Sequence, residues 1–207
     1  PSVDEHRVYT LGAAGMLSCF DTETGDLLWR VDTVTDYDAT VPVQGTSQAP
    51  IVEENLLIAA VGGEPDAKVV AFNKITGDEV WRSLDNISET GYSAPIIIDA
   101  GGARQLILWH ATAITSLNPK TGEIYWNQGF TIGGGMAITT PVRSGRYLAV
   151  SQFFNGTMML ALNPDRPDAR MLWKGRNRGE LPDQTDSLHS IISTPIVVGD
   201  HLYGIGS

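Results

Sequence analysis

Short runs of apolar residues alternate with turn-forming residues along the whole chain, and the pattern repeats. In the first repeat the apolar runs cover residues 1–3, 7–11, 16–20 and 27–31. Runs of this length between Gly, Pro, Asn and Asp residues are typical of β-strands. Many runs in the later repeats are apolar throughout, which is expected where both faces of a sheet are covered. The pattern therefore predicts an all-β chain of four-stranded antiparallel sheets.

A proline marks the first strand of each repeat. Proline lacks the N–H that an inner position of a sheet needs, but it is allowed as the first residue of a strand. The prolines are Pro1, Pro50, Pro95, Pro141 and Pro195. They divide one partial propeller, residues 1–207, into repeats at 1–49, 50–94, 95–140 and 141–194, with the start of a fifth at 195–207. Repeats of this length are typical of propeller blades or of another repeat array.

An eleven-residue unit lies between the third and fourth strands of each regular repeat. Its copies are Cys19–Trp29, Ala71–Trp81 and Ser116–Trp126, and an altered copy without the Thr-Gly pair runs from Ala161 to Trp173. An Asp or Asn in the unit can bond the backbone two residues on and so close the turn. Each regular copy has a glycine at the same position, where a hairpin with a bulge needs a positive φ. These glycines are Gly25, Gly77 and Gly122. A tryptophan at one register in every copy favours a packing contact between blades over ligand stacking.

The unit resembles the tryptophan-docking motif of the quinoprotein (PQQ-like) type of β-propeller repeat, Ala-x-Asp-x-x-Thr-Gly-x-x-x-Trp. The resemblance covers the whole chain and implies a β-propeller of four-stranded antiparallel blades, with about four blades and the start of a fifth. It implies that each docking tryptophan wedges against the neighbouring blade, namely Trp29, Trp81, Trp126 and Trp173. Quinone-dependent alcohol dehydrogenases, the outer-membrane-protein assembly lipoprotein and many non-catalytic secreted proteins share the repeat. A periplasmic, cell-envelope or secreted location is implied, whereas the activity stays open.

Composition narrows the classes of partner and of site. Fourteen basic against 24 acidic side chains give a net charge of -10, which argues against nucleic acid as a partner. Cys19 is the single cysteine, so the chain has no intrachain disulfide and no multi-cysteine metal site. No apolar run reaches the roughly 18 residues that span a bilayer. His-x-x-x-His and Cys-x-x-Cys spacings are also missing, and we predict no catalytic residues, no metal site and no cofactor.

Candidate binding residues come from the loops that enter each first strand and from the turns between second and third strands, because these segments share one face of an up-and-down sheet. Solvated loop residues or gap-filling packing are the simpler explanation for many of them. The candidates are Gln44, Gln48, Glu89, Tyr92, Trp109, His110, Asn155, Arg176, Arg178 and His189. Two long linkers, residues 32–49 and 174–194, are candidate binding loops. The first holds Asp32, Asp36 and Asp38, but it lacks the glycine and distal glutamate of an EF-hand loop.

Two hypotheses of different classes follow. The first is a non-catalytic propeller that presents a surface to a protein, peptide or glycan; a scaffold for outer-membrane protein assembly is a separate, third possibility. The second is part of a quinone-dependent dehydrogenase that binds pyrroloquinoline quinone with calcium. Such enzymes need calcium ligands, a base and, in one branch, an adjacent cysteine pair that Cys19 alone does not supply.

Four repeats and the start of a fifth predict an open arc with apolar blade faces at its ends. Propellers close with about four to eight blades, and exposed apolar faces of that size normally pair. We therefore expect a longer natural protein, self-association through the blade ends, or closure as an unusual four-blade ring.

Overall fold

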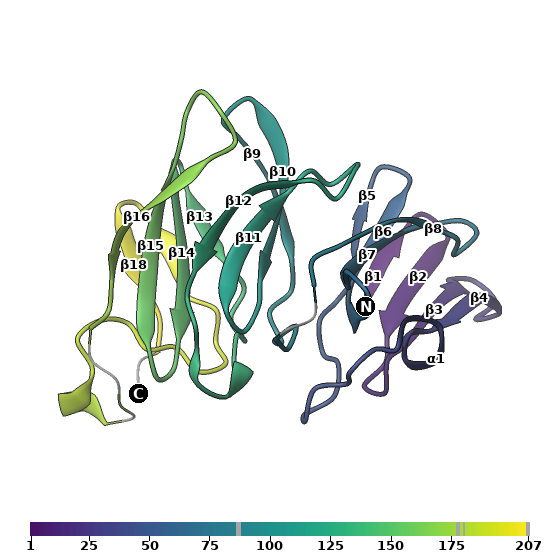
Figure 1. Cartoon of the computed structure of the whole chain (residues 1–207), viewed down its shortest axis with the longest axis horizontal. Helices are drawn as coiled ribbons and strands as arrows, with labels where there is room; N and C mark the ends of the chain where they lie inside the picture. Colours follow the sequence, from purple (N-terminus) through teal and green to yellow (C-terminus); the bar gives the residue numbers. More distant parts are fainter. Residues whose placement is uncertain (86–87, 177–178, 180, 206–207) are drawn as a thin grey trace. The chain divides into compact units, whose positions relative to one another are not determined.

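The computed structural model describes residues 1–85, 88–176, 179 and 181–205 (Figure 1). Within these residues the chain forms four four-stranded sheets and one two-stranded sheet, and the strand pairs are antiparallel. The prediction of an all-β chain of four-stranded antiparallel sheets is confirmed. No helix in this part of the chain is long and apolar enough to cross a membrane.

The chain divides into two compact units. Unit 1 comprises residues 1–90 and 119–123 and holds two of the four-stranded sheets. A short helix, α1 (Thr33–Tyr37), follows the first sheet. The strands are β1 (Ser2–Asp4), β2 (Arg7–Leu11), β3 (Met16–Asp21), β4 (Leu27–Asp32), β5 (Ile51–Glu53), β6 (Leu56–Gly63), β7 (Ala67–Asn73) and β8 (Glu79–Ser83).

Unit 2 comprises residues 91–118 and 124–207 and holds the other two four-stranded sheets and the two-stranded sheet. Its strands are β9 (Ile96–Ala100), β10 (Ala103–Trp109), β11 (Ala113–Leu117), β12 (Ile124–Gly129), β13 (Val142–Ser144), β14 (Tyr147–Gln152), β15 (Gly156–Leu162), β16 (Ala169–Lys174), β17 (Ile196–Val198) and β18 (His201–Tyr203). Two short 3-10 helices cover Gly133–Gly135 and Pro182–Gln184. Strand β17 lies beside β13.

A separate hydrophobic core lies in each unit. Tyr9, Leu17, Leu57, Val70 and Phe72 are fully buried in the core of unit 1. The core of unit 2 is built in the same way from inner strands of neighbouring sheets, with Ile107, Trp109, Ile114, Leu148 and Leu160 fully buried. The continuous apolar runs of the sequence thus correspond to strands that are covered on both faces.

The turn between third and fourth strands has the same construction in unit 1's two sheets. Asp21 Oδ1 accepts hydrogen bonds from the backbone of Glu23 and Thr24 at 2.8 and 2.9 Å. Asn73 Oδ1 accepts from Ile75 and Thr76 in the same way. A register shift precedes the turn in the sheets of both units, between Cys19 and Phe20, Ala71 and Phe72, Ser116 and Leu117, and Met159 and Leu160.

Two docking tryptophans lie against the Thr-Gly turn of the following repeat. Trp29 Nε1 donates to the carbonyl of Lys74 at 3.2 Å, and Trp81 Nε1 donates to the carbonyl of Pro119 at 3.1 Å. A Cβ atom at Gly77 would lie 2.8 Å from Cδ2 of Trp29. One at Gly122 would lie 2.6 Å from Cε3 of Trp81. These glycines, with φ of 81° and 73°, supply both the turn conformation and the space for the indole.

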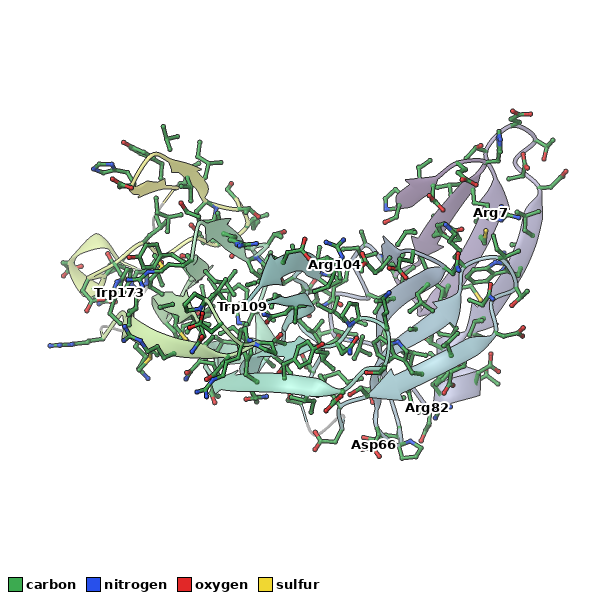
Figure 2. The ribbon with its side chains drawn as sticks, turned by 90° about the horizontal axis from the view of Figure 1, so that it is seen from above. Arg7, Asp66, Arg82, Arg104, Trp109 and Trp173 are labelled. Atoms are coloured by element: carbon green, nitrogen blue, oxygen red, sulfur yellow. The ribbon has the colours of Figure 1, made fainter. Side chains whose placement is uncertain are left out.

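The other two tryptophans have different surroundings. Trp126 Nε1 donates at 2.9 Å to Oε1 of Gln105, a residue of its own sheet. Trp173 is 47% exposed and lines a cavity of about 520 Å³ with Met159, Val197 and Leu202 (Figure 2). The turn that would receive Trp126 by analogy is the altered copy, which has no glycine between Asn163 and Trp173. The change in the sequence motif therefore coincides with a change in the bonding of the tryptophan.

The docking contact gives a direct stability test. Trp81 is 8% exposed, so we expect Trp81→Ala to lower the free energy of unfolding by about 3–5 kcal/mol through lost burial and the cavity left behind. Trp173→Ala is the matched control and should cost less than about 1 kcal/mol, because that side chain is half exposed. Urea unfolding followed by circular dichroism measures both. Equal losses in the two variants would contradict the docking role of Trp81.

Candidate functional site

Three segments come together at one end of unit 2, the lower end in Figure 1. They are the connection from β12 to β13, the turn from β14 to β15, and the segment that follows β16. Strand direction places the first two on one face, because a first-strand entry and a second-to-third turn lie at the same end of an up-and-down sheet. This is the face on which the sequence analysis placed its candidates.

The connection from β12 to β13 is held by backbone bonds to the turn between β10 and β11. Phe130 N donates to Thr112 O at 2.8 Å, and Ile132 N donates to Ala111 O at 3.0 Å. Gly133 N donates to Oδ1 of Asn155 at 3.3 Å, which joins the connection to the next turn. A loop bonded in this way at successive residues is pre-ordered for binding.

A buried polar cluster supports the turn from β14 to β15. The carbonyl of Phe153 accepts a hydrogen bond from Nδ1 of His189 at 2.7 Å, so that ring nitrogen carries the proton. His189 is fully buried, and its Nε2 lies 4.0 Å from Oδ1 of Asp186. Ser151 and Thr157 both donate their hydroxyl groups to the carbonyl of Leu188, at 2.7 and 2.6 Å. The segment around residue 188 is thereby fixed to strands β14 and β15.

Two adjoining cavities open between these segments, and together we name them the loop cleft. The first has a volume of about 730 Å³ and an apolar lining that includes Ile132, Phe154 and Leu181, with Gln184 beside them. The second has a volume of about 520 Å³ and is lined by Phe130, Lys174 and Arg176 among others. Thr131 and Asn155 line both cavities. The loop cleft is thus apolar at one end and cationic at the other.

The candidate residues of unit 2 fall into two groups. Asn155 and Arg176 line the loop cleft. Trp109 and His110 do not line it. Trp109, labelled in Figure 2, is fully buried and stacks on Phe130 with a centroid distance of 6.4 Å. His110 is buried, and its Nε2 lies 3.1 Å from Thr115 Oγ1. His189 is part of the supporting cluster, and Tyr92 N donates to Ala137 O at 2.7 Å. Arg178 lies outside the described residues.

The candidates of unit 1 do not come together around a cavity in the part of the chain that the structure describes. Gln44 is exposed and Glu89 is half-buried. Gln48 is buried, and its Nε2 donates to the carbonyl of Thr90 at 3.0 Å. Ser93, the equivalent residue one repeat later, donates in the same way to the carbonyl of Thr139 at 2.9 Å. Before Pro50 and Pro95 the polar residue two positions upstream therefore bonds the entry segment of the next repeat, whereas Thr139 donates to the carbonyl of Ser151 in strand β14 at 2.7 Å.

The acidic residues of the linker 32–49 have structural partners. Asp32 accepts from the backbone of Val34 and Thr35 and so forms the N-cap of α1, while Asp36 accepts from Asp32 N. Among the described residues, no group of three or more His, Cys, Asp or Glu side chains is arranged to hold a metal ion.

The same linker is anchored to the second sheet through Tyr37. The Tyr37 hydroxyl donates to Oε2 of Glu79 at 2.9 Å, and the Arg82 guanidinium lies 5.0 Å above the Tyr37 ring. Arg82 also donates to both carboxylate oxygens of Glu79, at 2.8 and 2.6 Å. The Arg82 contacts lower the pKa of Glu79, with a smaller contribution from the Tyr37 hydroxyl, while partial burial acts in the opposite direction.

Most residues of the loop cleft were not among the sequence candidates; they include Phe130, Thr131, Ile132, Phe154, Lys174, Leu181 and Gln184. The adjacent Phe153 and Phe154 in a turn were a usable signal, because two aromatic residues rarely stand side by side in a solvated turn. Lys174 and Leu181 belong to a linker whose length had marked it as a candidate binding loop. Nothing in the local sequence indicates that Thr131 faces this linker.

A protein-family model matches almost the whole chain. The model is described as outer membrane protein assembly factor BamB, and it covers residues 1–206. Among curated proteins, the quinoprotein alcohol dehydrogenase PedH of Pseudomonas putida is 27% identical over 165 residues, which are 70% of this chain and 26% of PedH. A quinoprotein ethanol dehydrogenase of Pseudomonas aeruginosa is 27% identical over 146 residues, which are 63% of this chain and 22% of that protein.

Solved structures share the fold at low sequence identity. BamB from Moraxella catarrhalis has a TM-score of 0.63 and 16% identity, with 97% of this chain and 54% of that chain covered. The quinohemoprotein alcohol dehydrogenase of Comamonas testosteroni has a TM-score of 0.57 and 14% identity, with 98% and 38% covered. The predicted propeller-type fold is therefore confirmed. The chain spans about half of the first protein and less than half of the second.

The Glu79 pKa gives a pH-dependent prediction. Because the folded-state pKa is lowered, the stabilisation is present above the ordinary carboxyl pKa of about 4.3 and is lost as pH falls through the folded value. We expect Glu79→Gln to lower the free energy of unfolding by about 1 kcal/mol at pH 7. The difference from wild type should shrink below about pH 4, as measured by urea unfolding.

The control is Asp99→Asn, which removes an exposed ion pair with Arg104 that spans 2.8 Å. Exposed pairs contribute little, so this variant should resemble wild type at both pH values. A Glu79→Gln effect that is independent of pH would contradict the predicted role of the carboxylate.

Proposed function

Because the chain belongs to the family of outer membrane protein assembly factor BamB, we propose that it is a non-catalytic propeller scaffold that binds a polypeptide partner. The observation that carries the proposal is the loop cleft of unit 2. Its apolar end, a cavity of about 730 Å³, is large enough for several side chains of a bound segment. Pre-formed clefts with apolar walls and a few polar groups are typical binding sites.

The walls of the loop cleft favour a flexible polypeptide over a polar ligand. Leu181 is 56% exposed, and Phe154 packs at a tilt on Phe153 with a centroid distance of 4.8 Å. When a partner covers exposed apolar groups at a rim, the removal of their surface from water stabilises the complex. The β14–β15 turn is meanwhile fixed by its bonds to residues 133 and 189, so little ordering cost opposes binding.

We further propose a cell-envelope location and a role in the assembly of envelope proteins. The support is the name of the matching family, outer membrane protein assembly factor, together with the fold shared with BamB from Moraxella catarrhalis. The partner under this proposal is an unfolded or extended protein segment, not a folded ligand with a fixed surface.

Peptide display tests the binding proposal. Random twelve-residue peptides displayed on phage, in separate libraries with free N-termini and free C-termini, are selected on the immobilised chain. Fluorescence anisotropy then measures the binding of the synthetic peptides. We expect apolar-rich peptides whose Kd rises about tenfold with Leu181→Ser, because one covered aliphatic side chain contributes on the order of 1.4 kcal/mol.

The matched control is Ile75→Ser, an exposed aliphatic residue in the Thr-Gly turn of unit 1. It is 47% exposed and lies outside the loop cleft, so this variant should bind every selected peptide as wild type does. Failure to select any peptide, or equal loss in the two variants, would overturn the proposal.

A second candidate function is a part of a quinone-dependent dehydrogenase, favoured by the 27% identity to PedH. The described residues do not fit the quinone site that the resemblance implies. Trp109, the tryptophan outside the docking register, is fully buried against Phe130, so neither a quinone nor another planar ligand reaches that face of its ring. Cys19 is a single buried thiol. The relatives alone support this candidate.

Thermal unfolding with added cofactor separates the two candidates. Under the scaffold proposal, pyrroloquinoline quinone with calcium leaves the melting temperature unchanged. A saturable rise that needs both components, and that calcium alone does not produce, would favour the dehydrogenase instead, because a ligand that binds the folded state stabilises it.

A further inference from the structure

We propose that the loop cleft recognises the C-terminal carboxylate of a polypeptide whose last residue is apolar. The inference rests on the proposed polypeptide-binding function and names the chemical feature that the cleft selects. It follows from three observations: two cations at one end of the cleft that form no ion pair among the described residues, an available amide donor at its centre, and an apolar cavity directly beside that donor.

The cationic end consists of Lys174 and Arg176, which lie on or just after strand β16. Among the residues that the structure describes, neither side chain forms an ion pair, and no carboxylate lines this cavity. The chain as a whole carries a net charge of -10, so two cations around one cavity depart from its average surface. Two cations at one end of a cleft favour an anionic ligand.

An acidic residue does lie nearby, and its position is informative. Asp186 Oδ2 accepts a hydrogen bond from the backbone N–H of Arg176 at 2.9 Å, and Asp186 lines a neighbouring cavity that Lys174 and Arg176 line as well. The carboxylate thus holds the Arg176 main chain in place. Arg176 lines the loop cleft too, whereas Asp186 does not.

The central donor is the side-chain amide of Asn155. This residue is 9% exposed, lines both cavities, and has its Oδ1 engaged by Gly133 N. Because this atom accepts a hydrogen bond from an N–H group, it is the amide oxygen, and the other terminal atom of the amide is the nitrogen Nδ2. Its two N–H groups have no partner among the described residues, and they are available to a ligand because Asn155 lines both cavities. A ligand oxygen can therefore accept a hydrogen bond from Nδ2.

The arrangement fits a terminal carboxylate better than the side chain of an internal Asp or Glu. In a C-terminal residue the carboxylate and the side chain leave the same Cα atom in different directions. The loop cleft has its anion-binding end and its apolar end on either side of Thr131 and Asn155. A carboxylate between Asn155 and Arg176 would therefore place the last side chain toward Phe154 and Ile132. An internal acidic residue would bring its own polar main chain to the apolar cavity.

A pair of synthetic peptides tests the proposal. The probes are fluorescein-labelled hexapeptides of sequence Gly-Ser-Gly-Ser-Leu-Phe, one with a free C-terminal carboxylate and one with a C-terminal amide. Anisotropy titrations at low salt should give a Kd at least tenfold lower for the acid. Arg176→Gln and Lys174→Gln should each raise the Kd of the acid several-fold and leave the Kd of the amide unchanged. Phe154→Ala should weaken both peptides.

The matched control is Arg166→Gln, which removes an exposed cation of unit 2 that pairs with Asp168 and lies outside the loop cleft. It should bind both peptides as wild type does. If the acid and the amide bind with equal affinity, and Leu181→Ser weakens the binding of both, carboxylate recognition is overturned while the polypeptide-binding function stands. If neither probe binds, carboxylate recognition is wrong, and the display selection decides separately whether the cleft binds any peptide.

Discussion

The contact between an indole and a glycine of the following turn is the constraint on which unit 1 depends. Trp29 and Trp81 each bond a carbonyl of that turn and occupy the space that a Cβ atom at Gly77 or Gly122 would fill. One residue of the turn must therefore have a positive φ and also lack a side chain. Only glycine meets both requirements well. Unit 1 accordingly includes residues 119–123, the turn that receives Trp81, although the strands on either side of that turn belong to unit 2.

Where the motif changes, the structure changes with it. The altered fourth copy has no Thr-Gly pair, and Trp126 bonds Gln105 of its own sheet instead of a carbonyl in a following turn. A buried indole N–H needs an acceptor, and the same Gln105 oxygen also accepts from Ser116 at 2.7 Å. Loss of the glycine is thus compensated within the third sheet.

The strand number, the antiparallel pairing and the third-to-fourth turns could all be predicted from the sequence, because each depends on residues close together in the chain. The loop cleft could be predicted only in part. Asn155 and Arg176 were identified from loop position, but their neighbour Thr131 comes from a different connection, and only the folded sheets bring it close. Trp109 and His189 resembled rim residues in the sequence. Both are fully buried: Trp109 ends strand β10 and stacks on Phe130, and His189 bonds the carbonyl of Phe153, contacts that no local pattern indicates.

The positive charge at the loop cleft is opposite in sign to the net charge of the chain, and the two charges influence a ligand over different distances. A net charge of -10 repels acidic partners, but salt screens that repulsion beyond about 8 Å at physiological ionic strength. Lys174 and Arg176 act at contact, where screening is weak and hydrogen bonds to the ligand form. A partner with many acidic residues would therefore meet more of this repulsion than a segment with one terminal carboxylate. The combination favours a ligand with a single negative charge beside an apolar group over a generally acidic surface.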